Sequence, residues 1–169
     1  GVMVNFIEKG FRMLDQAFAE VYSKFKLHFY KKVFSRFEGR EASLTTVESF
    51  CMEIIQALDG PTVNEFASFV QISPPNAAYK VNSLIQKGYL KKVRSKEDRR
   101  EYHLRTTQKY FDYYNISYGY LSIVMERIKQ RFSEDEVEKL EQILLIISNE
   151  LMPEIELPLQ RALPRPMED

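Results

Sequence analysis

The stretch from Gly60 to Thr107 most constrains the fold, because it carries in succession the signals of a short helix, a second helix and a β-hairpin. The first segment, Thr62 to Val70, opens with Thr62 and has Glu65 three residues later, a capping-box pattern that begins a helix. Its apolar residues fall on one face. That face needs a neighbour to cover it, so we expect this helix to support the segment that follows.

A second helix is predicted to begin after Ser73, with the serine as N-cap and Pro74 in the first helical position, where a missing N–H costs nothing. Gln71 and Ile72 form the tight turn before it, and Gly88 ends the helix as its C-cap. The apolar residues at helical spacing are Ala77, Val81, Leu84 and Ile85, and the opposite, exposed face carries Asn76, Tyr79, Lys80 and Ser83.

Residues 89–94 and 101–106 alternate their side chains as expected of two strands in a hairpin. The hairpin and its loop hold the densest cluster of cations in the chain: Lys91, Lys92, Arg94, Lys96, Arg99, Arg100 and Arg105. Helix, turn, helix and basic hairpin together predict a winged helix-turn-helix, a mainly α-helical fold with a small β-hairpin wing. In this arrangement the second helix enters the major groove of duplex DNA, and a wing arginine can reach the minor groove.

Four runs of residues carry a further signal: LTTVE at 44–48, GPTVNEFA at 60–67, KGYL at 87–90, and EDRR at 97–100 followed by LRTT at 104–107. They resemble the motifs of the MarR family of bacterial transcriptional regulators, and the resemblance covers roughly residues 44–107. It implies that Asp98 holds the wing in shape by pairing with Arg100, and that Arg100 enters the minor groove.

The chain departs from the family pattern at two places. Ser95 stands where many relatives have an acid at the start of the wing, and Pro74-Pro75 replaces a Pro-Ser pair, so one hydroxyl contact near the DNA backbone is missing. The residues expected to bind DNA are Ser73, Pro75, Asn76, Tyr79, Lys80, Ser83, Lys96, Arg99 and Arg100.

The distribution of charge supports DNA binding, although the formal net charge of zero on its own argues against a nucleic-acid partner. Residues 79–109 hold ten Lys or Arg and three Asp or Glu, a net of +7, whereas residues 134–169 hold ten acids and three cations, a net of −7. The molecule should therefore orient as it approaches DNA, because phosphate attracts one end and repels the other. For the acidic segment alone, a solvated face is the preferred explanation.

Amphipathic helices precede the central stretch. Apolar positions separated by three or four residues form a seam along a first helix that continues towards Phe37: Val4, Ile7, Phe11, Leu14, Phe18, Val21, Phe25 and His28. A second helix is predicted from Thr45 to Leu58, with Thr45 as N-cap and Glu48 three residues later.

Two further helices are predicted after the wing. Apolar residues recur at the same spacing from Phe111 to Phe132 and from Val137 to Leu151, and Ser133 followed by Glu136 marks the start of the last helix. One winged module offers too little surface to cover three long one-sided helices, so we expect a helical bundle built from two copies of the chain. A two-fold dimer also places its recognition helices about 34 Å apart, on successive turns of DNA.

These patterns divide the chain into four parts. They are an N-terminal dimerisation helix (residues 1–43), a winged helix-turn-helix domain (44–107), C-terminal dimerisation helices (108–152) and a proline-rich tail (153–169). The tail contains Pro153, Pro158, Pro164 and Pro166, which prevent a continuing helix. It is therefore either an arm over the partner or loosely ordered.

The remaining composition narrows the class of protein. A single cysteine, Cys51, excludes an internal disulfide framework or a cysteine-based zinc site and fits a reducing compartment. No apolar run is long enough to cross a bilayer and no signal-peptide pattern opens the chain, so we expect a cytoplasmic protein without a membrane partner. The absence of a glycine-rich phosphate loop, of paired metal-binding histidines and of a nucleophile with a base argues against an enzyme and predicts no cofactor or metal.

Several residues have two interpretations. For Cys51 an inert core thiol competes with a redox trigger, and for His28 a packed, hydrogen-bonded ring competes with a metal ligand. His103, on the wing strand, either touches phosphate or is solvated. Aromatic residues after the wing either belong to the core or line a pocket for an aromatic effector, as in relatives that bind phenolic ligands. The candidate residues of that pocket are His28, Cys51, Tyr110 and Tyr113.

Together these features predict a homodimeric, sequence-specific DNA-binding regulator that recognises a pseudo-palindromic operator and represses transcription until a small effector releases it. The rival interpretation is a winged-helix module that binds another protein and never contacts DNA. Such a module needs a hydrophobic or acidic exposed helix face, whereas this chain has a basic wing. Gel filtration with and without duplex DNA separates the two.

Overall fold

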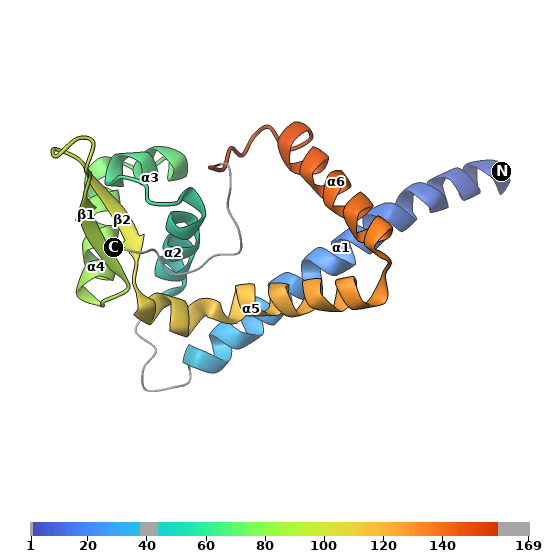
Figure 1. Cartoon of the computed structure of the whole chain (residues 1–169), viewed down its shortest axis with the longest axis horizontal. Coiled ribbons are helices and arrows are strands. Elements are labelled where there is room, and N and C mark those ends of the chain that lie inside the picture. Colours follow the sequence, from blue (N-terminus) through green and yellow to red (C-terminus); the bar gives the residue numbers. More distant parts are fainter. Residues whose placement is uncertain (1, 38–43, 159–169) are drawn as a thin grey trace.

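The computed structural model describes residues 2–37 and 44–158, and within them the side chains of residues 13–35, 44–112 and 119–158 (Figure 1). These residues form six helices and one two-stranded antiparallel sheet. In chain order the elements are α1 (Val2–Phe37), α2 (Thr46–Leu58), α3 (Val63–Val70), α4 (Pro74–Gln86), β1 (Leu90–Arg94), β2 (Tyr102–Thr106), α5 (Gln108–Arg131) and α6 (Glu134–Glu150). The predicted mainly α-helical fold with a small hairpin is confirmed.

A shared hydrophobic core joins α2, α3, α4 and the hairpin into one winged module at one end of the molecule (Figure 1). Met52 and Ile55 of α2, Phe66 of α3 and Leu104 of β2 are completely buried in it. The full set of buried core residues is Phe29, Leu44, Cys51, Met52, Ile55, Phe66, Ala67, Ala77, Val81, Leu84, Tyr89, Leu90, Leu104 and Tyr110. Because every element except α6 contributes, α3 and α4 are held on several sides.

The hairpin is fixed to this module by backbone and buried side-chain bonds. Its strands pair antiparallel, with Leu90 opposite Thr106 and Arg94 opposite Tyr102. The Leu104 N–H donates to the Pro61 carbonyl at 2.7 Å. In the interior, Thr106 Oγ1 donates to Gln56 Oε1 of α2 at 2.7 Å. The wing therefore extends from the module at a defined place.

Helices begin where the sequence predicts. Capping boxes open α2, α3 and α6, and a serine N-cap followed by proline opens α4. In the last case Ser73 Oγ accepts a hydrogen bond from the Asn76 N–H at 3.2 Å. Each of these signals lies within one helical turn, so the surrounding fold does not alter it.

Helix ends differ from the prediction at one position. The C-cap of α4 is Lys87, in right-handed backbone conformation, and Gly88 follows it with a φ of 83°. Glycine therefore occupies the position after the cap, where a left-handed residue turns the chain into β1. Asp59 and Gln71 adopt positive φ at the ends of α2 and α3 without being glycine.

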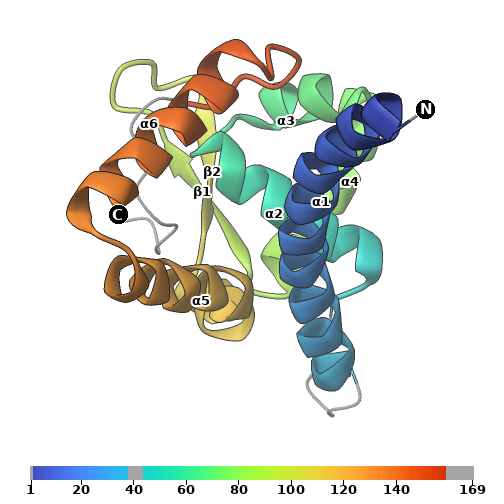
Figure 2. The ribbon, with the colours of Figure 1, turned by 90° about the vertical axis from the view of Figure 1, so that its right-hand side faces the viewer.

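The long helices α1 and α5 extend away from the winged module, and α6 turns back from the far end of α5 (Figure 1). Helices α1 and α5 contact each other, with the His28 and Tyr120 rings stacked at 3.9 Å and the Phe25 and Tyr120 rings 5.7 Å apart. Viewed along the long axis, α1 lies on one side and α6 on the other (Figure 2). None of the helices in the described part of the chain is long and apolar enough to span a bilayer.

The apolar seam predicted along α1 is largely uncovered within one chain. Leu14, Phe18 and Val21 expose 73%, 59% and 56% of their surface. The side chains of Val4, Ile7 and Phe11 lie outside the described residues. Helix α6, which is described over its full length, has no buried residue.

Candidate nucleic-acid interface

The N-terminal half of α4 presents an exposed face beside the wing. Tyr79 is 77% exposed, and Pro75 and Asn76 are also exposed. On the opposite side, Ala77 and Val81 are completely buried and anchor the helix in the core. The sequence therefore produces a rigid helix whose first two turns offer an aromatic ring and an amide to a ligand.

In the C-terminal half of the same face Ser83 is half-buried, whereas the sequence predicted an exposed position. Lys80 is only half-exposed, and Ser83 Oγ donates to Glu48 Oε2 of α2 at 3.0 Å. Lys87 Nζ donates to the other oxygen of the same carboxylate, Oε1, at 2.7 Å. Ser83 was expected on the free face, but its hydroxyl is used within the module. The sequence placed Glu48 only in a capping box and missed this role.

The environment of Glu48 keeps its carboxylate charged. Burial raises the pKa of this group, but hydrogen bonds from Lys87, Thr45 and Ser83 outweigh the burial, so the net pKa lies below its ordinary value. A buried carboxylate with this many donors is satisfied, and its charge is balanced by the Lys87 ammonium.

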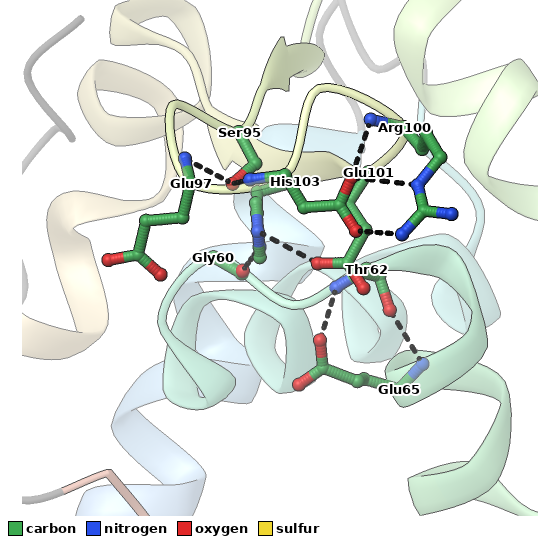
Figure 3. Close-up of polar contacts among 9 residues, drawn as sticks. Gly60, Thr62, Glu65, Ser95, Glu97, Arg100, Glu101 and His103 are labelled. Carbon is green, nitrogen blue, oxygen red and sulfur yellow. Dashed lines mark hydrogen bonds and ion pairs between the residues drawn. The ribbon is translucent and has the colours of Figure 1, made fainter.

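The loop at the tip of the wing is shaped by Ser95 (Figure 3). Its hydroxyl oxygen accepts hydrogen bonds from the backbone N–H groups of Glu97 and Asp98, both at 3.2 Å. Its own N–H donates to the Glu101 carbonyl at 2.8 Å, and the Glu101 N–H donates to the Asp98 carbonyl at 3.0 Å. A hydroxyl therefore closes this loop without an additional negative charge.

Arg100 is held at the exposed edge of the loop by Asp98. The Arg100 backbone N–H and Nε donate to Asp98 Oδ1 at 3.0 and 3.1 Å, and Nη2 donates to Oδ2 at 3.1 Å. These bonds from Arg100 lower the pKa of the Asp98 carboxyl. The Arg100 side chain is nevertheless 90% exposed, so its guanidinium is oriented and accessible. The pairing that the family resemblance implied is present.

His103 makes its contacts within the winged module. Its Nδ1 lies 2.7 Å from the Gly60 carbonyl, which requires that this nitrogen carries the proton and donates (Figure 3). Its Nε2 lies 3.9 Å from the Glu101 carboxylate. The ring is half-buried and links the wing to the turn between α2 and α3. It is a support of the wing rather than a surface group.

Arg94 and Tyr102, opposite each other at the outer end of the hairpin, form a further exposed pair. The Arg94 guanidinium donates to the Tyr102 hydroxyl from Nε at 3.1 Å and from Nη2 at 2.7 Å. Lys96 and Arg99 are exposed in the adjacent loop. Tyr102 was missed by the sequence reasoning, although its register opposite Arg94 follows from the hairpin itself.

The start of α5 is connected to the end of α4. Thr107 Oγ1 donates to the Gly88 carbonyl at 2.6 Å, and Lys109 Nζ donates to the Lys87 carbonyl at 2.7 Å. The Lys109 ammonium also lies 4.6 Å from the centroid of the Tyr89 ring. These contacts join the long helix α5 to the C-terminal end of α4.

Two candidate effector residues lie in the core. Cys51 and Tyr110 are 5% and 3% exposed, and burial raises the pKa of the Cys51 thiol. This placement favours the inert core thiol over a redox trigger, because a thiol with a raised pKa forms little thiolate. Tyr110, which lies off the predicted seam, also packs in the core. The side chain of Tyr113 lies outside the described residues.

His28 packs by stacking on Tyr120. Its ring is parallel to Tyr120 within 7°, and its Nδ1 is buried without a hydrogen-bond partner in the described part of the chain. Burial, and then the charges of Lys32 and Lys31, lower its pKa and favour the neutral ring. Among the described residues, no group of three His, Cys, Asp or Glu side chains could hold a metal ion.

The sequence of the winged module matches a known family model. The model of the MarR family matches residues 44–102, from the residue before the α2 N-cap to the first residue of β2. Residues 44–102 are a MarR family domain. Members of this family are DNA-binding transcription regulators rather than enzymes. No curated protein matches the sequence.

The likeness to solved MarR family structures extends beyond that domain. Streptococcus pneumoniae FabT in complex with DNA superposes with a TM-score of 0.57 at 19% identity, covering 86% of this chain and 99% of the FabT chain. A MarR family protein from Bacillus stearothermophilus gives 0.57 at 13% identity, covering 85% and 96%. A MepR mutant from a multidrug-resistant S. aureus clinical isolate gives 0.57 at 16% identity, covering 82% and 97%. At these identities the likeness establishes the fold, including the long helices.

Proposed function

We propose that the chain is a homodimeric, sequence-specific DNA-binding transcriptional regulator that recognises a pseudo-palindromic operator. The observation that carries this proposal is the exposed face of α4 beside a wing whose Arg100 is oriented by Asp98 and 90% exposed. An oriented guanidinium at the tip of a hairpin suits the narrow, electronegative minor groove, and the adjacent helix suits the major groove. The MarR family match supports both assignments.

The charge distribution supports a defined approach to DNA. The net charge of +7 over residues 79–109 lies on α4, the wing and the start of α5. Helix α6, whose first turn holds Glu134, Asp135 and Glu136, lies away from the wing (Figure 1). Phosphate therefore attracts the molecule wing first, and this attraction weakens as salt increases.

A dimer is supported by the uncovered apolar residues of the long helices. Phe34 of α1 is 73% exposed, and Leu145 and Ile146 of α6 are 53% and 49% exposed. Large apolar side chains left exposed in this number are typical of a surface that a partner covers. A second copy would cover it by two-fold symmetry and bring a second reading helix to the next turn of DNA.

The regulatory output proposed is repression by occlusion of polymerase, with release by a small aromatic effector. The effector would act by binding more tightly to a dimer whose reading helices no longer match successive grooves, since only such differential affinity can shift the population. The contacts of Thr107 and Lys109 with the end of α4 give a path by which movement of α5 reaches the reading helix.

The test is the salt dependence of DNA binding by Arg100→Ala, measured on duplexes selected from a random pool by the parent protein. The variant should bind more weakly at every salt concentration. The slope of log affinity against log salt should decrease in magnitude by about one, the change expected when one phosphate contact is lost. Lys129→Ala, a change in an exposed ion pair with Glu126 on α5, is the matched control and should bind as the parent does. If Arg100→Ala also matches the parent throughout, the wing does not bind DNA.

A further inference from the structure

Three helices in the described part of the chain begin with the same local device. They are α2 with Thr45 and Glu48, α3 with Thr62 and Glu65, and α6 with Ser133 and Glu136. In each, the glutamate accepts a hydrogen bond from the N-cap N–H, at 3.0, 3.2 and 3.1 Å respectively. Glu65 and Glu136 are exposed, whereas Glu48 is buried. Comparing Glu48 with Glu65 and Glu136 therefore separates any further role of Glu48 from helix capping.

In addition to capping α2, Glu48 accepts hydrogen bonds from two side chains at the end of α4: Ser83, in the helix, and Lys87, its C-cap. Ser83 and Lys87 lie four residues apart, on one face of the helix, and donate to the two oxygens of the Glu48 carboxylate at 3.0 and 2.7 Å. The Glu48 side chain is 10% exposed and that of Lys87 is 31% exposed. One buried carboxylate thus holds the C-terminal half of α4 at two points, one turn apart.

The two hydrogen bonds to Glu48 fix the rotation and the axial position of α4, which the apolar core alone does not define. Ala77, Val81 and Leu84 hold α4 in the module through non-directional contacts, which tolerate small rotations and shifts along the helix axis. Hydrogen bonds require direction and distance, so two of them to successive turns define both the rotation and the axial position of α4. The exposed Asn76 and Tyr79 lie on the same face, nearer the N-terminus.

We propose that Glu48 is a positioning residue that sets the angle at which α4 presents its N-terminal half to the major groove. It thereby determines sequence specificity without contacting DNA. Recognition helices read base edges mainly through their first turns, so a small rotation at the anchored end moves those side chains relative to the bases. Lys87 balances the charge of Glu48, which prevents the carboxylate from repelling nearby phosphates. This inference rests on the proposed function, because it assigns α4 as the reading helix.

The test compares Glu48→Gln with Glu65→Gln, which makes the same change in the capping box of α3, where the glutamate is exposed. Glutamine can still accept the N-cap hydrogen bond in both helices, but at position 48 it removes the charge that pairs with Lys87. Affinity is measured for the duplex that the parent selects from a random pool and for a shuffled duplex of the same length. Thermal unfolding is measured on each variant, and Ser83→Ala provides a second variant that leaves the capping box intact.

We expect Glu48→Gln to lower the ratio of selected to shuffled affinity by roughly tenfold, because affinity for the selected duplex falls and affinity for the shuffled duplex does not. Ser83→Ala should lower the ratio in the same direction, and Glu65→Gln should keep the ratio of the parent. The inference is overturned if Glu48→Gln and Ser83→Ala both keep that ratio, or if they weaken binding to both duplexes equally. If the parent protein selected no duplex from the pool, the proposed function and this inference would both be wrong. If the parent selects a duplex but the variants keep its ratio, only the inference is wrong.

Discussion

Two adjacent acids at the tip of the wing differ in what their side chains contribute. The Asp98 carboxylate accepts three hydrogen bonds from Arg100, whereas Glu97 contributes to the loop through its N–H, which donates to Ser95. Both acids carry a negative charge at the edge expected to approach phosphate. Removing each carboxylate in turn therefore separates the effect of negative charge on DNA binding from the effect of orienting Arg100.

Asp98→Ala is expected to weaken operator binding roughly tenfold, because Arg100 loses the carboxylate that orients it. Glu97→Ala removes the same charge without removing that pairing, and should strengthen binding by reducing repulsion from phosphate. Fluorescence anisotropy with labelled operator measures both. If the two variants strengthened binding to the same extent, charge alone would govern the wing and the orienting role of Asp98 would be wrong.

Whole elements were predictable where their signals are local. Thr45, Thr62, Ser73 and Ser133 begin helices because their partners lie three residues along the chain, and a sequence displays that spacing directly. Ser83 was misplaced because its partner is 35 residues away, on a helix whose rotation the sequence does not show.

The same reason explains His103 and the candidate pocket. His103 bonds the carbonyl of Gly60, 43 residues away, and a strand pattern gives the face of a residue but not the loop that meets it. Tyr110 lies off the predicted seam and is still buried, because the start of α5 packs into the core of the winged module. Long-range packing, which has no counterpart in local spacing, decides such positions.

At the scale of elements, the wing depends on its buried bond to α2. Thr106→Val removes the hydroxyl that donates to Gln56 Oε1 and should lower the free energy of unfolding by about 1–3 kcal/mol, because a buried acceptor loses that donor. Urea unfolding followed by circular dichroism measures this. Thr46→Val, at an exposed position on α2, should change stability by less than about 0.5 kcal/mol. Equal effects of the two substitutions would contradict the docking role of Thr106.

The whole molecule combines a basic winged module with long helices that carry exposed apolar residues. Residues 44–102 match the MarR family model, and the likeness to solved structures extends to the flanking helices. If those helices bind a second copy, affinity for a two-site operator depends on assembly. The residues proposed to contact DNA and the exposed apolar residues of the long helices should then be separable by mutation.

Phe18→Asp tests that dependence on assembly. Phe18 of α1 is 59% exposed, and a carboxylate there should prevent burial against a partner and shift the protein to monomers. Affinity for the selected operator should fall to that for a single half-site. Lys24→Asp places the same residue at a polar position of α1, 69% exposed, and should leave the dimer intact. Sedimentation equilibrium measures the mass, and a dimeric Phe18→Asp protein would exclude this part of α1 from the interface.

The spacing of half-sites tests most directly whether two reading helices act on one duplex. Operators selected from a random pool are lengthened at their centre by five or ten base pairs, and affinity is compared with that for the original duplex and for one isolated half-site. A five-base-pair insertion turns one half-site to the opposite face of the helix, since a turn contains about ten base pairs. We predict that this insertion lowers affinity to the half-site level. Equal affinity for the original, the lengthened duplexes and the half-site would contradict paired recognition.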